Sequence, residues 1–306
     1  MKNDYHVPVL LEEVTNLLNP QKSGKYIDGT VGEGGHSEAI LKIGSPDCLV
    51  LGIDADPEAI DSARNRLEIF GSRVVLQQAN FVFMAELAAE AGFVPCDGII
   101  MDLGLSSLQL EREDRGFSFQ REGPLDMRFD PNQERTGARV VNNYPGKELQ
   151  RIFEEFGELR GARRIAQGIV GMRPFHSSLD LAKFLSKMIG RHGKIHPATK
   201  VFQAIRMEVN QELNNLETGL NQVIKLLGSR RRLAVISYHS LEDRVVKRAF
   251  VRAAAHCVCP PKIPVCVCGH VPEIRLITKK PITPSWLEVK NNPRSRSARL
   301  RVAEHV

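Results

Sequence analysis

A glycine-rich break between an apolar run and a helical pattern constrains this chain more than any other feature. Tyr26-Ile27-Asp28 ends in a carboxylate, four glycines follow between positions 29 and 35, and helical spacing resumes at Ser37. This order predicts a β-strand, a tight turn and the N-terminus of a helix. Nucleotide-like ligands bind at that place in α/β sheets, so the stretch predicts an α/β fold with a ligand site.

The charge beside the turn predicts which ligand is bound. A dinucleotide motif requires G-x-G-x-x-G, and the nearest register, Gly32-x-Gly34-x-x-Ser37, lacks its third glycine. Asp28 at the strand end would repel a pyrophosphate and attract a cation. S-adenosylmethionine carries a sulfonium and an ammonium group, which suits an acidic pocket. An ordinary β-α turn without a ligand is the alternative.

Three further apolar runs, at positions 48–54, 74–76 and 98–104, alternate with helical patterns and predict a doubly wound parallel sheet. Two of them carry an acid at their end, Asp54 and Asp102, as the first strand does. Asp54 follows the glycine turn by about twenty residues, the spacing of a carboxylate that binds ribose hydroxyls. Phe81, after the third strand, is expected to pack against adenine, or else to belong to the core.

The pattern changes after position 104. Polar, glycine-rich loops and successive helical stripes, without a strand between them, predict a helical insertion at 113–195 within a discontinuous domain, 1–112 and 196–306. A fifth strand at 233–237 leads to His239 at the same crevice as Asp102, where a structural histidine is the alternative to a functional one. Segments 273–278 and 298–303 are expected to complete the sheet.

Composition limits the location and partners of the protein. The 306 residues carry a formal charge of +6, which fits a polyanionic partner without requiring one. No apolar run approaches the length of a membrane span, and the N-terminus lacks the apolar core of a signal peptide. We therefore expect a cytoplasmic protein with reduced cysteines and no membrane partner.

Arginines gather in the insertion and in the C-terminal tail. Those of the insertion either contact RNA or form a solvated face, and those of the tail are expected to reach phosphates. They are Arg160, Arg163, Arg164 and Arg173, and Arg294, Arg296, Arg299 and Arg301.

Four of the six cysteines, Cys257, Cys259, Cys266 and Cys268, lie within twelve residues as two C-x-C pairs. Four thiols at this density suit tetrahedral zinc, although C-x-C is tighter than the usual C-x-x-C. A cysteine-lined loop without metal is the alternative, and the metal assignment stays open.

Ordered sequence blocks along nearly the whole chain resemble the RsmH (MraW) family of bacterial S-adenosylmethionine-dependent methyltransferases. The blocks are His6-Val7-Pro8-Val9-Leu10-Leu11, Asp28-Gly29-Thr30 with Gly32 and Gly34-Gly35-His36, Asp102-Leu103-Gly104 with Ser106-Ser107 and Gln109, Arg115-Gly116-Phe117-Ser118-Phe119, Gly123-Pro124-Leu125-Asp126-Met127-Arg128, His196-Pro197-Ala198-Thr199, Ser240-Leu241-Glu242-Asp243-Arg244 and Asn292-Pro293-Arg294-Ser295-Arg296-Ser297.

The resemblance implies a class I (Rossmann-like) methyltransferase sheet with an inserted helical substrate-recognition domain. It also implies methylation of N4 of a cytidine in the decoding centre of 16S rRNA, within an assembled or nearly assembled small subunit, and it leaves a homodimer open. By similarity, the cofactor contacts fall on Gly34, Gly35, His36, Asp54, Phe81, Asp102 and Gln109.

The catalytic residues follow less directly. An exocyclic amine is a poor nucleophile and needs an acceptor for its hydrogens. The acid-or-Asn signature with two prolines and an aromatic, typical of DNA amino-methyltransferases, is absent after Asp102. The candidates are Asp102, Ser106 and His239, with Ser107 and Tyr238 beside them. For Asp102 we favour binding of the cofactor's amino group over a role as acceptor.

Two other functions compete with this interpretation. A nicotinamide-dependent oxidoreductase is disfavoured by Ser37 and by the acids at the strand ends. A non-catalytic RNA-binding assembly factor that retains the cofactor-type fold fits the same sequence. Methyl incorporation into small subunits distinguishes that factor from an enzyme.

Overall fold

The computed structural model describes residues 7–119, 122–190, 196, 198–260 and 265–306. Its chain divides into two compact units, Met1–Gly104 with Leu213–Val306, and Leu105–Glu212. His6 and Pro197, which belong to two of the sequence blocks above, lie outside the described residues. Within the described ranges, no helix has both the length and the apolar character needed to cross a membrane.

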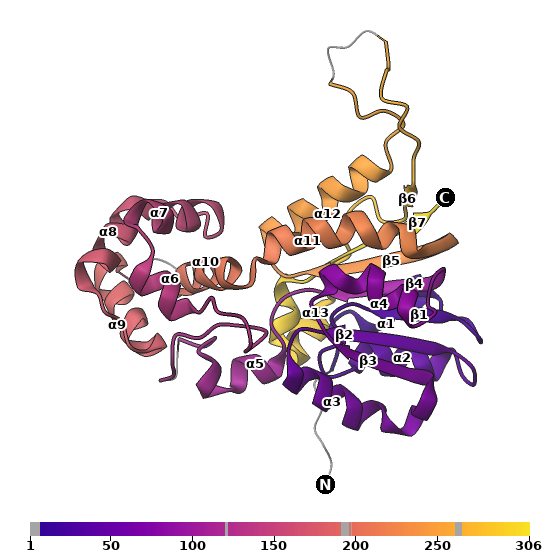
Figure 1. Cartoon of the computed structure of the whole chain (residues 1–306), viewed down its shortest axis with the longest axis horizontal. Helices are drawn as coiled ribbons and strands as arrows, with labels where there is room; N and C mark the ends of the chain where they lie inside the picture. Colours follow the sequence, from indigo (N-terminus) through magenta and orange to yellow (C-terminus); the bar gives the residue numbers. More distant parts are fainter. Residues whose placement is uncertain (1–6, 120–121, 191–195, 197, 261–264) are drawn as a thin grey trace. The chain divides into compact units, whose positions relative to one another are not determined.

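The first unit is built on a seven-stranded sheet, drawn in Figure 1, with the order β3-β2-β1-β4-β5-β7-β6. The first five strands are parallel, and β7 runs antiparallel to β5 and β6. The predicted α/β, Rossmann-like sheet is confirmed, including its two late strands. The strands are β1 (Lys25–Asp28), β2 (Leu49–Asp54), β3 (Val74–Gln78), β4 (Cys96–Asp102), β5 (Leu227–Ser237), β6 (Ile274–Leu276) and β7 (Arg299–His305).

Helices cover both faces of this sheet, because successive side chains of a strand point to opposite faces. Ile27 and Ile99 pack in one core with helices α4, α11 and α12, whereas Tyr26 and Ile100 pack in the other with α1, α2 and α3. The helices are α1 (Leu11–Leu18), α2 (Gly35–Ile43), α3 (Pro57–Leu67), α4 (Met84–Glu90), α11 (Glu212–Val223), α12 (Ser240–Ala253) and α13 (Trp286–Asn291).

The second unit is helical and has its own core. Its helices are α5 (Ser107–Glu111), α6 (Gly137–Asn143), α7 (Gly146–Glu155), α8 (Ala162–Met172), α9 (Ser178–Ile189) and α10 (Ala198–Asn210). The predicted insertion, 113–195, lies inside this unit. The unit extends further because Val201 and Ile205 of α10 share one core with Leu149 and Ile152 of α7. Substrate recognition by this unit stays a prediction.

Several arginines expected to contact RNA are instead used within the protein. Arg301 is 9% exposed, and its Nε lies 2.6 Å from Oδ1 of Asp243. Arg299 also binds this carboxylate, at 3.1 Å. The expectation that Arg301 reaches phosphates is therefore wrong, because its side chain is buried in an ion pair. In the second unit, Arg173 donates hydrogen bonds to the carbonyl oxygens of Val141 and Tyr144.

Candidate functional site

Three carboxylates lie at the carboxyl ends of neighbouring strands. Asp28 ends β1, Asp54 ends β2 and Asp102 ends β4, and β1 lies between the other two strands. Asp28 pairs in register with Gly52 and Ile100, so Asp54 and Asp102 each lie two residues further along than Asp28. The parallel sheet therefore brings these acids to one edge.

Asp28 is used by the glycine turn itself. It is 2% exposed, its Oδ2 accepts a hydrogen bond of 2.7 Å from the Ser37 hydroxyl, and its Oδ1 accepts one of 3.3 Å from the Thr30 amide. Burial raises the pKa of Asp28 to about 6, although His36 and Ser37 oppose the rise. Asp28 thus fixes the turn, and Asp54 and Asp102 are the more accessible acids.

Asp54 connects the glycine turn to the next helix. Its Oδ2 accepts a hydrogen bond of 2.9 Å from the Gly32 amide, and its Oδ1 accepts one of 2.9 Å from the Asp56 amide. Burial raises the pKa of this carboxyl to about 6. Asp56 in turn caps α3 by accepting from the Glu58 amide. The carboxylate is held in place and remains partly exposed, as a ribose ligand requires.

Asp102 has the most elaborate surroundings of the three acids. Its Oδ1 accepts a hydrogen bond of 2.9 Å from the Tyr238 hydroxyl, and its Oδ2 lies 3.5 Å from Nε2 of His36. The backbone amide of Asp102 donates to the Thr30 hydroxyl at 2.6 Å. Burial and the neighbouring Asp102 raise the pKa of Tyr238 well above 10, so its phenol stays a donor. Asp102 is therefore oriented while 23% of its side chain remains exposed.

His36 carries unused hydrogen-bonding capacity. Its side chain is 6% exposed, and neither ring nitrogen has a hydrogen-bond partner among the residues that the structure describes. A buried polar atom normally has a partner, because leaving it unpaired costs about 1–3 kcal/mol. These nitrogens, next to a partly exposed carboxylate, are the strongest local sign of a polar ligand.

Gly34 and Gly35 are required by packing. Gly34 adopts φ +80°, and a Cβ there would lie 3.1 Å from Leu67 of α3. A Cβ at Gly35 would lie 2.2 Å from Pro8. The two glycines let the turn approach these neighbours, and their predicted cofactor contacts stay predictions.

Phe81 packs against a helix of its own unit. A Cβ at Gly219 of α11 would lie 2.9 Å from the Phe81 ring. The ring is partly buried at the margin of one sheet core, so these contacts favour the core alternative. Asn80, just before it, accepts from the Val82 amide and caps the following turn.

Ser106 and Gln109 belong to the second unit and form a capping box at the start of α5. The Ser106 hydroxyl accepts from the Gln109 amide, and the Gln109 side-chain oxygen accepts from the Ser106 amide, each at 3.1 Å. These bonds explain why both residue types stand here. Their assignments as catalytic and cofactor-binding residues stay predictions.

His239 caps helix α12. Its Nδ1 accepts from the Glu242 amide at 3.3 Å, and Oε2 of Glu242 accepts from the amides of Tyr238 and His239. Nε2 of His239 lies 3.1 Å from Oε1 of the same glutamate. The Nδ1 contact matches the structural alternative for His239, whereas Nε2 has no hydrogen-bond partner among the described residues. The catalytic assignment of His239 stays a prediction.

Sequence reasoning missed two hydroxyls of this site, those of Thr30 and Ser37. Ser37 was noted only as the missing third glycine of a dinucleotide motif, yet it donates to Asp28. Thr30 accepts from the Asp102 backbone, 72 residues away in the chain. The signal available for Ser37 was a hydroxyl in the first turn of the helix that follows the glycine-rich turn, nine residues past Asp28. Thr30 could be found only from the pairing of β1 with β4.

We expect Asp28→Asn to change how stability depends on pH. Between about pH 4 and about pH 6, the native Asp28 carboxyl keeps a proton that an unfolded aspartate releases. The native state then binds more protons, so this group lowers the free energy of unfolding as the pH rises. Asparagine removes that penalty and can pair with both Ser37 and Thr30. The free energy of unfolding of the variant, compared with that of wild type, should therefore rise by about 2 kcal/mol between about pH 4 and about pH 6.

Urea unfolding at pH values from 4 to 7 measures the difference between the two proteins. Asp61→Asn, which replaces an exposed acid of α3, is the matched control. An Asp28→Asn difference that stays constant from pH 4 to pH 7 would contradict a raised pKa for the buried carboxyl.

This chain is similar to known proteins over almost its whole length. A family model described as the MraW methylase family matches residues 3–306. Ribosomal RNA small subunit methyltransferase H of Dehalococcoides mccartyi is 50% identical over 302 residues, covering 98% of this chain and 86% of that protein. The proteins of the same name from Thermomicrobium roseum and Citrifermentans bemidjiense are 51% identical over 305 residues and 46% identical over 312 residues. The match to the Thermomicrobium protein covers 98% of this chain and 94% of that protein. The match to the Citrifermentans protein covers 100% of both chains.

Proposed function

Because this chain belongs to the MraW methylase family, we propose that it transfers a methyl group from S-adenosylmethionine to ribosomal RNA of the small subunit. We assign the acceptor as N4 of a cytidine in the decoding centre of 16S rRNA, in an assembled or nearly assembled subunit. The observation that carries the proposal is the set of strand-end acids beside the unpaired His36 ring, within a chain that matches the Citrifermentans bemidjiense protein over the whole of both chains.

The residues at the sheet edge fit S-adenosylmethionine chemically. The unpaired nitrogens of His36 offer hydrogen bonds, and the partly exposed carboxylates of Asp54 and Asp102 suit ribose hydroxyls and a cationic amino group. When bound, the cofactor supplies an electrophilic methyl group on its sulfonium. Asp54 would then hold the ribose, and Asp102 would hold the ammonium group.

The chain's own residues orient Asp102 before any ligand arrives. The Tyr238 phenol donates to Oδ1, which leaves Oδ2, on the His36 side, to accept from a ligand. Orienting a charged group in advance lowers the cost of binding and of transition-state stabilisation. The hydrogens of the cytosine amine need a further acceptor, for which Ser106 and His239 remain the candidates.

Exposed arginines lie on the proposed RNA-facing edge of the sheet. Strand β7 is antiparallel to β5, and Arg299 pairs with Ser237 at the carboxyl end of β5. The short 3-10 helix η5 (Pro293–Ser297), just before β7, therefore lies near the edge where β4 ends. Arg294 and Arg296 of η5 are exposed, which allows them to contact phosphates.

Charge reversal of these two arginines should weaken RNA binding. For Arg294→Glu with Arg296→Glu we expect affinity for small-subunit RNA to fall at least about tenfold and the salt slope to decrease by about 2. Filter binding over a salt series measures both quantities. Lys225→Glu with Arg230→Glu is the matched control, because these exposed cations lie at the amino end of β5. An unchanged salt slope in the η5 variant would refute phosphate contact by η5.

Methyl incorporation tests the proposed function directly. Small subunits that lack the modification are incubated with the protein and labelled cofactor, and the RNA is digested and analysed by mass spectrometry. We expect one methyl group on N4 of a cytidine, and none on subunits that already carry it. Label on another base would overturn the N4 assignment. Cofactor and RNA binding without incorporation would identify a non-catalytic assembly factor.

A further inference from the structure

The segment between α12 and β6, described at residues 254–260 and 265–273, extends away from the sheet unit as a long excursion, visible in Figure 1 above α12. Its two ends are joined, because the Glu273 amide donates to the Ala253 carbonyl at 2.8 Å. Cys257, Cys259, Cys266 and Cys268 lie on the two arms of this excursion. The mechanism proposed above uses none of these cysteines.

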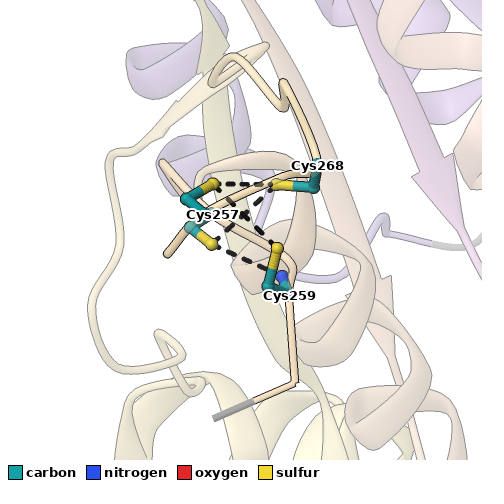
Figure 2. Close-up of side chains that lie close together, drawn as sticks. Cys257, Cys259 and Cys268 are labelled. Atoms are coloured by element: carbon teal, nitrogen blue, oxygen red, sulfur yellow. Dashed lines mark hydrogen bonds between the residues drawn. The ribbon is translucent and has the colours of Figure 1, made fainter. Parts of the chain in front are cut away.

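The four sulfur atoms converge on one point. All four Sγ atoms lie within 4.8 Å of one another. Three pairs are in close contact: Cys266 to Cys268 at 3.5 Å, Cys257 to Cys268 at 3.8 Å and Cys259 to Cys266 at 4.0 Å. Figure 2 labels Cys257, Cys259 and Cys268 of this cluster. Sulfur atoms about 2.3 Å from a tetrahedral zinc ion are about 3.8 Å apart, so the observed separations match the edges of such a site. They are too long for disulfide bonds of about 2.05 Å.

Hydrophobic burial does not explain why these thiols converge. The cysteines are exposed or only partly buried. The nearby apolar side chains point to solvent, with Val265 at 70% and Val267 at 77% exposure. Little apolar area is removed from water here, so the hydrophobic effect contributes little to holding the two arms together.

Backbone amides near the cluster point at sulfur. The Val258 amide donates to Sγ of Cys268 at 3.5 Å, and the Cys259 amide donates to Sγ of Cys257 at 3.4 Å. Such bonds stabilise negative charge on sulfur and orient it, as hydrogen bonds around metal ligands do. Four thiolates this close would repel one another unless a cation lay between them.

We propose that Cys257, Cys259, Cys266 and Cys268 bind a single zinc ion and that this ion holds the two arms of the excursion together. Four protein sulfurs complete a tetrahedral shell, which leaves no position for water or substrate, so the site is structural. Binding displaces the protons of the thiols that become ligands. This site is independent of the methyl-transfer function and does not require it.

Metal analysis of the full-length protein tests the proposal. Protein purified under reducing conditions without added chelator should contain one zinc ion per chain by elemental mass spectrometry. The Cys257→Ser, Cys259→Ser variant should lose it. Cys48→Ala removes a buried cysteine elsewhere and is the matched control, which should keep its zinc. Cobalt substitution should give the intense visible absorption of a tetrahedral thiolate site.

The state of the thiols supplies a second measurement that does not depend on a variant. In the native protein, alkylation should spare the four cysteines until a strong chelator is added. Four freely alkylated thiols in zinc-free, folded protein would overturn the proposal. A protein mass reduced by the hydrogens that are lost when two disulfide bonds form would also overturn the proposal. Iron in place of zinc would overturn it as well.

Discussion

Asp102→Asn is expected to weaken binding of S-adenosylmethionine about a hundredfold, which corresponds to about 3 kcal/mol. The substitution keeps the shape of the side chain but removes the negative charge that would pair with the cofactor's ammonium group. Tyr238 can still donate to the amide oxygen, so the orientation of the side chain is largely preserved. Isothermal titration calorimetry measures the change directly, and methyl transfer should fall with it at limiting cofactor.

Asp97→Asn provides a matched control on the same strand. Asp97 lies at the amino end of β4, is 22% exposed and pairs with Arg231, whereas Asp102 lies at the carboxyl end and is 23% exposed. Asp97→Asn should leave cofactor affinity within about twofold of wild type. If Asp102→Asn binds the cofactor normally yet loses methyl transfer, Asp102 is the acceptor for the cytosine amine and the role we favour is wrong.

Gly116→Ala should destabilise the helical unit by more than about 4 kcal/mol. Gly116 adopts φ +67°, and a Cβ there would lie 1.8 Å from the carbonyl oxygen of Pro124. That contact is with backbone, so no side-chain rotation relieves it. The loop cannot shift easily, because hydrogen bonds hold it on both sides. The Met127 amide donates to the Arg115 carbonyl, and the Arg115 guanidinium donates to the Phe129 carbonyl.

Gly161→Ala distinguishes the steric clash from the backbone strain. Gly161 lies in the same unit with φ +79°, but a Cβ there meets no atom within 4 Å. Gly161→Ala should lower the free energy of unfolding only by the left-handed backbone penalty of about 1–2 kcal/mol. Thermal unfolding followed by circular dichroism, with hydrogen exchange over Leu105–Glu212, compares the two variants. Equal losses of stability in Gly116→Ala and Gly161→Ala would show that the contact with Pro124 relaxes at little cost.

The sheet could be predicted in detail because its signals are local. Short apolar runs located the first five strands, and alternating segments located the last two. The limits of the helical unit were harder to predict. Helix α10 has the same periodic apolar pattern as a helix packed on the sheet, and only its contacts with α7 place it in the second core.

The site shows the same division between local and distant signals. The sequence correctly predicted that Asp54 and Asp102 end strands, and the spacing of the cysteines marked the cluster. It did not distinguish buried Asp28 from the more exposed acids, because burial depends on Ser37 and Thr30 closing over its carboxylate. The tail arginines looked alike in sequence, yet Arg301 is buried against Asp243 and Arg296 is exposed.

The amino-acid sequence was enough to predict where the strands occur along the chain, which acids stand at their ends and which family the chain belongs to. These follow from periodicity and from short motifs, which act over a few residues. The three-dimensional structure was needed to show which acid is buried, which histidine nitrogens lack a partner among the described residues and which sulfurs meet. Those properties depend on contacts between residues far apart in the chain, such as Tyr238 with Asp102, and no local pattern encodes such contacts.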